Sequence, residues 1–153
     1  MQNNENIDYT YADKAAAKAV SKTTAMGIYS VEKLLEKLFD DREIVRFLKD
    51  QLSAYTRFFK DANGILRSFD EEPYRANVFE KLMVKSAICM QAGADKTDSH
   101  IAKMMLKGTE MGIIELSEIK NQYEDVLSPD VMHLVEEVLL SLDAFDKDMK
   151  SFL

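Results

Sequence analysis

The chain has 153 residues, a formal charge of −7 and a composition that is 46% hydrophobic and 31% charged, which suits a single globular domain with a sizeable core. Its 20 basic residues are fewer than its 27 acidic ones and are spread thinly, so we expect neither nucleic-acid binding nor a basic membrane-binding patch. No apolar run approaches the roughly 20 residues that span a bilayer, and nine Met, no Trp, five Gly and two Pro favour an all-α fold.

The first predicted helix follows a polar N-terminal segment, residues 1–9, which we expect to be flexible before a single domain over 10–153. Thr10 is predicted to cap this helix, with Asp13 reaching back in a capping box. Small and apolar residues then recur at alternating spacings of four and three, which places them on one face. The helix is expected to end near Asp40. The residues of its face are Val20, Thr24, Gly27, Val31, Leu34 and Leu38.

The second predicted helix begins at another capping box, formed by Asp40 and Glu43. The same alternation of spacings continues along it, and Asn63 with Gly64 is expected to loosen its last turn. The residues of its face are Ile44, Leu48, Gln51, Tyr55, Phe58, Ala62 and Ile65.

The third predicted helix starts after Asp-Glu-Glu-Pro at 70–73, because acidic residues favour a helix N-terminus and proline is accepted in the first turn. It runs from Pro73 to Gln91, a length that can carry the chain from one end of a bundle to the other. Cys89 is the only cysteine of the chain, so no internal disulfide can form and we interpret it as a packed thiol. Together with the polar residues 1–8, which do not resemble a secretory leader, this predicts a cytoplasmic location.

The last two predicted helices repeat the pattern of the first two. Residues 95–99 offer several N-caps for the fourth helix, and Ser128 with Pro129 caps the fifth. The face of the fourth helix comprises Ala102, Met105, Thr109, Gly112, Leu116, Ile119 and Tyr123. The face of the fifth comprises Val131, Val135, Val138, Leu142, Phe145, Met149 and Phe152.

A short motif supports the interpretation that the two helix pairs are repeats. Thr-x-Met-Gly-Ile occurs at 24–28 and again at 109–113, an offset of 85 residues (109 − 24), and an offset of 87 aligns the face of the fifth helix with that of the second. The offset is too long for a solenoid repeat. We therefore predict two helical hairpins in one bundle, with close helix approach at Gly27 and Gly112. If the first helix runs up, the second runs down, the 73–91 helix returns up, the fourth runs down and the fifth up.

This arrangement resembles the ferritin-like superfamily, in which two helical hairpins are joined by a long crossover. More narrowly, Ser-His-Ile-Ala-Lys-Met at 99–104, followed by Lys-Gly-Thr-Glu-Met-Gly-Ile-Ile at 107–114, is similar to a group of uncharacterised bundle proteins from anaerobic bacteria. The resemblance implies an all-α, ferritin-like four-helix bundle with a helical crossover.

The resemblance also implies a test for a di-metal site, which uses a Glu from each of two helices and a Glu-x-x-His from each of the others. The chain has two histidines, and Thr97 stands where the carboxylate before His100 would be. Asp130 with His133 is the nearest approximation, but an acidic residue favours a helix N-terminus without any metal. The two histidines are also predicted to lie at opposite ends of the bundle. We therefore expect no intact di-metal site.

One carboxylate, Glu115, falls within the predicted apolar face of the fourth helix. Its repeat counterpart is Ser30, which antiparallel pairing places level with Gln51 and one turn from Tyr55. These four residues are predicted to form a polar layer or a ligand site. Glu115 could fix helix register through hydrogen bonds within the layer, extend toward solvent, or take part in a small-ligand or single-metal site.

The sequence thus favours a binding or structural module over an enzyme, since it contains no Ser-His-Asp spacing, phosphate-binding Gly-rich loop or Cys-x-x-Cys motif. No resident cofactor and no catalytic residue are expected. Tyr29 and Ile114 point away from the predicted seam, and Met26 and Met111 lie on its flank. We therefore expect the crossover helix, through residues 74–83, to cover one apolar surface and a second copy, in a homodimer, to cover another. The alternative is an atypical metal-binding or redox protein holding iron or manganese, with Glu115, Asp130 and His133 as candidate ligands.

Overall fold

The chain folds into five helices in a computed structural model that describes residues 9–92 and 95–153. They are α1 (Tyr9–Leu35), α2 (Glu43–Ser68), α3 (Val78–Ala92), α4 (Asp98–Tyr123) and α5 (Pro129–Lys150). No strand occurs in the described ranges, which confirms the all-α prediction. Nor does any helix in them combine the length and apolar character needed to cross a membrane. Of the predicted flexible segment, residues 1–8 lie outside the described residues and Tyr9 is the first residue of α1.

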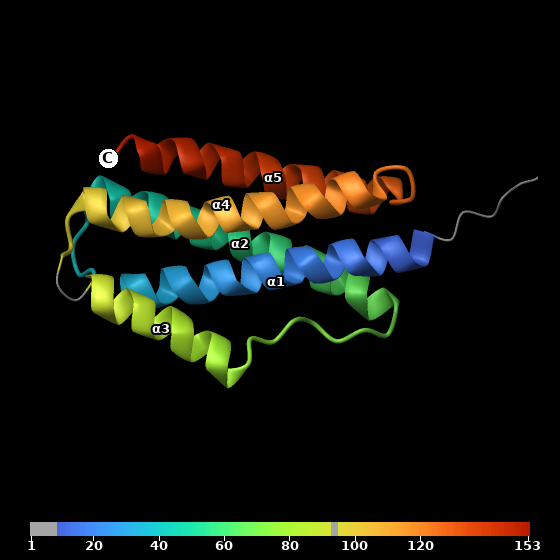
Figure 1. Cartoon of the computed structure of the whole chain (residues 1–153), viewed down its shortest axis with the longest axis horizontal. Coiled ribbons are helices and arrows are strands. Elements are labelled where there is room, and N and C mark those ends of the chain that lie inside the picture. The colour runs from blue at the N-terminus through green and yellow to red at the C-terminus, as the bar shows by residue number, and fades with distance from the viewer. Residues whose placement is uncertain (1–8, 93–94) are drawn as a thin grey trace, which may run out of the picture.

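Four long helices lie side by side, and α3 packs outside them against α1 and α4 (Figure 1). α1 and α2 form one antiparallel hairpin, and α4 and α5 form another. Contacts of α1 with α4 and of α2 with α5 join the hairpins into one core. After α2 the chain returns along the bundle, so α4 runs in the same direction as α2 (Figure 1). The helix directions agree with those predicted from the sequence.

The core follows the apolar faces that the spacing predicts. Residues of all four long helices lose nearly all of their solvent exposure, and this burial supplies most of the favourable free energy of folding. The largest fully buried side chains include Phe58, Leu34, Ile44, Leu48, Leu66, Ile101, Leu116, Leu142 and Met149.

The turn between α1 and α2 differs from the prediction at both helix ends. α1 ends at Leu35 rather than near Asp40, because the Lys37 and Leu38 amides bond three residues back instead of four, which tightens and terminates the helix. The predicted capping box of Asp40 and Glu43 is wrong. Asp40 Oδ1 instead accepts hydrogen bonds from the backbone N–H and the Nε–H of Arg42, at 3.2 and 2.7 Å. Arg42 is the N-cap residue of α2. The Arg42 guanidinium also contacts Asp98 Oδ1 at 2.9 Å, which ties this turn to the start of α4.

The end of α2 is held by contacts that the local sequence does not show. The helix continues past Asn63 and Gly64 to Ser68, contrary to the expected loosening. Asn63 is buried, and its Oδ1 accepts a hydrogen bond from the Ser21 hydroxyl of α1 at 2.8 Å. Tertiary packing therefore overrides the weak helix preference of the Asn-Gly pair. Asp70, with φ of 56°, then turns the chain out of the helix.

The crossover is only partly helical, so the prediction of a helix beginning at Pro73 is wrong. Residues 71–77 have no regular secondary structure, and α3 begins at Val78. The Tyr74 N–H donates to Ser21 Oγ at 3.1 Å instead of to a helical carbonyl. α3 starts at a reciprocal capping box in which the Glu80 N–H donates to Asn77 Oδ1 and the Asn77 N–H donates to Glu80 Oε2, at 2.8 and 2.9 Å.

Asp13 also bonds elsewhere than predicted. It is buried, and its Oδ1 accepts the N–H of Ser128, the N-cap residue of α5, at 2.9 Å. The carboxylate thus joins α1 to the turn between α4 and α5 and places negative charge near the N-terminus of α5, where the helix dipole favours it. In α4, the Thr97 hydroxyl accepts the His100 N–H at 3.4 Å, so Thr97 caps that helix.

Candidate functional site

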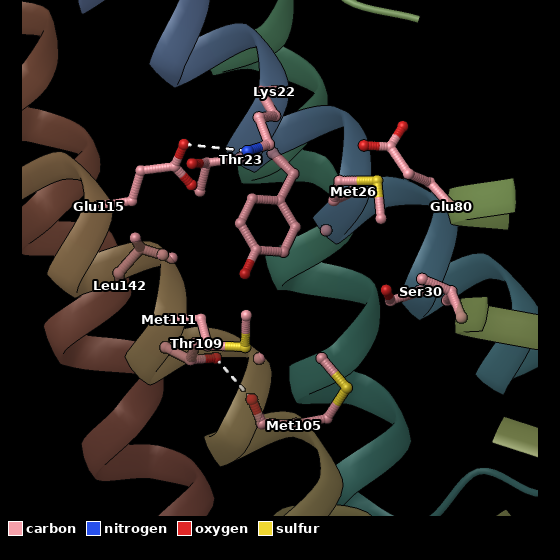
Figure 2. Close-up of a pocket in the computed structure, with 15 residues that line it drawn as sticks. Lys22, Thr23, Met26, Ser30, Glu80, Met105, Thr109, Met111, Glu115 and Leu142 are labelled. Carbon is pink, nitrogen blue, oxygen red and sulfur yellow. Dashed lines mark hydrogen bonds and ion pairs between the residues drawn. The ribbon is translucent and has the colours of Figure 1, made fainter. Parts of the chain in front are cut away.

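A pocket of about 310 Å³ lies where the two copies of the Thr-x-Met-Gly-Ile motif face each other across α1 and α4 (Figure 2). Met26 and Gly27 of the first copy line it, as do Met111 and Gly112 of the second. Val84 of α3 forms part of the outer wall. The repeat thus frames a cavity as well as a helix interface.

The two repeated glycines, Gly27 and Gly112, are both closely packed at the floor of the pocket. A Cβ atom on Gly27 would lie 2.7–2.9 Å from ring carbons of Tyr55, and one on Gly112 would lie 3.0 Å from Thr23 Cγ2 and 3.5 Å from Leu142 Cδ1. Tyr55 and Leu142 are counterparts by the offset of 87 residues. The predicted close helix approach is therefore confirmed at both glycines.

Two threonines make the same bond in each copy. The Thr24 hydroxyl donates to the Val20 carbonyl at 2.7 Å, and the Thr109 hydroxyl donates to the Met105 carbonyl at 2.8 Å. Figure 2 shows the second of these bonds at the pocket wall. Because a threonine can satisfy its hydroxyl on its own helix in this way, both residues can be buried without a partner on another helix.

Tyr55 is the polar residue of the floor. Burial raises the pKa of its phenol, and the side chains of Gln51 and Thr109 act in the opposite direction. Gln51 is also buried, and its Nε2 makes no hydrogen bond of ordinary geometry within the described part of the chain. By the repeat, Gln51 and Tyr55 correspond to Val138 and Leu142, so the phenol of the floor has no polar counterpart in the second hairpin.

Glu115 does not join Ser30, Gln51 and Tyr55 in a hydrogen-bonded layer. Its side chain is 40% exposed, and its Oε1 accepts a hydrogen bond from Lys22 Nζ of α1 at 3.2 Å (Figure 2). This position corresponds to the predicted alternative in which the carboxylate extends toward solvent. Ser30, Tyr55 and Glu115 nevertheless line the same pocket, so the structure brings together three of the four predicted residues, while Gln51 does not line it.

A second carboxylate, Glu80 of α3, lines the pocket near its mouth. It accepts a hydrogen bond from the Tyr74 hydroxyl, which together with the Asn77 N–H lowers the pKa of Glu80. Burial, this hydrogen bond and the negative charges of Glu80 and Glu115 raise the pKa of Tyr74 to about 12. The mouth therefore combines two carboxylates with the single ammonium group of Lys22.

The proposed metal ligands do not come together. His133 is 73% exposed and lies 3.5 Å from Glu137 of its own helix, and His100 lies 3.8 Å from Asp95. The histidines stand near the starts of antiparallel α5 and α4, so they lie at opposite ends of the bundle as predicted. Among the residues that the structure describes, no three histidine, cysteine or acidic side chains form a group able to hold a metal ion. Asp130 is exposed, and the side chain of Cys89 lies outside what the structure describes.

Sequence reasoning missed Lys22, Thr23 and Glu80. Lys22 and Glu80 carry no signal beyond that of ordinary charged helix residues, because only the packing of α3 and α4 against α1 brings them together. Thr23 could have been found through its position directly before the repeated motif. Its Oγ1 is buried and has no hydrogen-bond partner among the described residues.

Comparison of the chain with protein-family models, curated proteins and solved structures finds no match. The inference of function therefore depends on the geometry and chemistry of this pocket.

Proposed function

We propose that the chain is a ferritin-like bundle protein that binds a small, largely apolar ligand in the pocket between its repeats and does not perform di-metal chemistry. The observation that carries this proposal is the pocket itself, whose walls include three methionine side chains, Met26, Met105 and Met111. Methionine is unbranched and polarisable, so it adapts to apolar ligands of varied shape. Two antiparallel hairpins and a long return segment support the ferritin-like part of the proposal.

The size of the pocket limits the ligand. Sites for small molecules usually measure about 300–1,000 Å³, so a pocket of about 310 Å³ suits a short aliphatic chain or a single ring. Its polar groups lie at the Tyr55 floor and at the Lys22 and Glu115 mouth. A ligand would therefore bury its apolar body between these two regions.

Gly108 provides a way to fill the pocket without disturbing the fold. It lines the pocket, and a Cβ atom there would meet nothing within 4 Å. Gly64 of α2 has the same open surroundings and does not line the pocket. Gly108→Leu and Gly64→Leu thus form a matched pair. Both replace a helical glycine and gain about 0.5–1 kcal/mol of helix preference, but only the first occupies the site.

The test is titration of the whole protein with octanol, followed through the NMR signals of the methionine methyl groups. We expect the signals of Met26, Met105 and Met111 to shift while that of Met149, in the core, stays in place. In Gly108→Leu we expect binding to weaken about tenfold, because the leucine takes the room of about two methylenes, each worth about 0.8 kcal/mol. Gly64→Leu should bind as the unaltered protein does. Equal binding by both variants, or no shift at all, would refute the proposal.

Self-association is a second element of the proposal, supported by large apolar side chains left exposed on α3 and α4. Leu82, Met83, Met111 and Ile114 are each more than half exposed. A second copy that covered them would remove this apolar area from water. We expect a dimer mass by light scattering at tens of micromolar protein, and a monomer mass under these conditions would contradict this element.

An atypical metal-binding role is the competing function. Glu115 and Glu80 both line the pocket, but the Lys22 ammonium bonded to Glu115 opposes a bound cation of high charge. Elemental analysis after loading with iron or manganese distinguishes the two functions. Stoichiometric metal that disappears in Glu115→Ala would favour the metal-binding role, and we expect no such metal.

A further inference from the structure

The mouth of the pocket carries an excess of negative charge. The charged residues that line the pocket are Lys22, Glu80 and Glu115, which makes two carboxylates against one ammonium. Figure 2 shows Glu80 and Glu115 on either side of Lys22. A ligand head group at this mouth therefore meets one attractive and two repulsive charges if it is anionic, and the reverse if it is cationic.

Each carboxylate retains capacity for a further partner. Glu115 has one hydrogen-bond partner among the described residues, Lys22, and both side chains of this pair are close to half exposed, at 40% and 45%. Exposed ion pairs contribute little stability, so this one rearranges at small cost. Glu80 Oε2 accepts hydrogen bonds from the Asn77 N–H and the Tyr74 hydroxyl, which hold the carboxylate in place and leave its Oε1 without a partner among the described residues.

One further group indicates the sign of the electrostatic potential at the mouth. Tyr74 lies beside the mouth, and the negative charges of Glu80 and Glu115 contribute to its raised pKa. The potential at this point is therefore negative. No basic residue other than Lys22 lines the pocket to offset that potential.

We propose that the ligand of this pocket is a cationic amphiphile, with an aliphatic or aromatic body against Met26, Met105 and Met111 and a single protonated amine at the mouth beside Glu80 and Glu115. This inference rests on the proposed apolar-ligand function and adds the charge of the ligand. An alkyl carboxylate of the same length would have to compete with Glu115 for Lys22 while facing Glu80.

The experiment compares octylammonium, octanol and octanoate, which share one chain and differ in head-group charge, by titration of the full-length protein below their aggregation concentrations. We expect octylammonium to bind about two- to fivefold more tightly than octanol, the range for one favourable exposed charge interaction, and octanoate to bind more weakly than octanol. The difference should shrink in high salt because these charges are solvent-accessible.

Glu115→Gln tests the origin of the preference. We expect it to reduce the ratio of octylammonium to octanol affinity about two- to fivefold, because the ratio isolates the charge of the head group. Glu110→Gln is the matched control, because Glu110 is an exposed residue of the same helix that does not line the pocket; it should leave the ratio unchanged. If octanol binds and octanoate binds as well as or better than octylammonium, the cationic inference is overturned and the pocket remains. If none of the three binds, both proposals are overturned.

Discussion

Replacing Gly27 by alanine adds one methyl group at the point where the backbone of α1 meets the ring of Tyr55. The new Cβ would lie 2.7 Å from Cε2, 2.8 Å from Cζ and 2.9 Å from Cδ2 of that ring, closer than two carbon atoms approach without repulsion. Tyr55 is buried, and its rigid ring must shift as a whole to relieve this contact, which the end of a flexible side chain would do at smaller cost. We therefore expect Gly27→Ala to destabilise the protein.

The magnitude follows from two opposing effects. Alanine gains about 0.5–1 kcal/mol over glycine in the interior of a helix, whereas overpacking of a core usually costs about 1–3 kcal/mol. Gly64→Ala shares the gain without the cost, because a Cβ atom there meets nothing within 4 Å. The difference in free energy of unfolding between the two variants should thus be about 1–3 kcal/mol. Gly64→Ala should be more stable than the unaltered protein.

Urea-induced unfolding followed by circular dichroism measures this difference directly. Adding Tyr55→Leu, which gives the first hairpin the residue that the second has at position 142, removes the ring and should reduce the cost of Gly27→Ala in a double-mutant cycle. Equal stability of Gly27→Ala and Gly64→Ala would contradict this expectation, as would an effect of the added methyl group that Tyr55→Leu leaves unchanged.

Three further predictions concern groups that join the helices. Asp13→Ala should lower the free energy of unfolding by about 1–3 kcal/mol in urea, because the Ser128 N–H loses its charged partner; a change below about 0.5 kcal/mol would be that of an ordinary surface site. Ser21→Ala should speed hydrogen exchange of the Tyr74 amide, which it bonds at 3.1 Å, and unchanged exchange would contradict the anchoring role. Glu80→Gln should lower the pKa of Tyr74 from about 12, seen by NMR of the tyrosine ring carbons. Because the folded chain holds this proton more tightly than the unfolded chain, the contribution of Tyr74 to stability is full below about pH 10 and lost as the pH rises toward 12.

Much of the fold follows from periodic patterns that act over many residues. The alternating spacings predict all four long helices and their buried faces, because burying one stripe of a helix is a collective effect that no single residue determines. Gly27 and Gly112 could be assigned to close helix contacts because the repeat places each of them on a buried face. The errors occur at helix ends, where one hydrogen bond decides between alternatives. α3 begins at Val78 rather than Pro73 because the Tyr74 N–H bonds to α1.

The candidate site was predictable in its location but only partly in its chemistry. The interruption of the apolar face at Glu115 pointed to the right level of the bundle. The repeat identified Ser30 near it, and antiparallel pairing of the first two helices identified Tyr55. Lys22 could not be paired with Glu115, because the pairing depends on the rotation of α1 relative to α4, which sequence spacing leaves undetermined. An exposed ion pair therefore stands where a buried polar layer was expected.

The segment 71–77 has a consequence for how copies of the chain could assemble. Together with α3 it joins two hairpins of similar length and packing, and it is held to α1 by the Tyr74–Ser21 hydrogen bond and by the ion pairs of Glu71 with Lys14 and Lys18. Such a hinge allows two molecules to exchange hairpins, each completing its core with α4 and α5 of the other, without any new surface. In the exchanged dimer, α1 and α4 around each pocket would belong to different chains. Assembly and ligand binding would then be linked, and dilution of the protein would weaken both together.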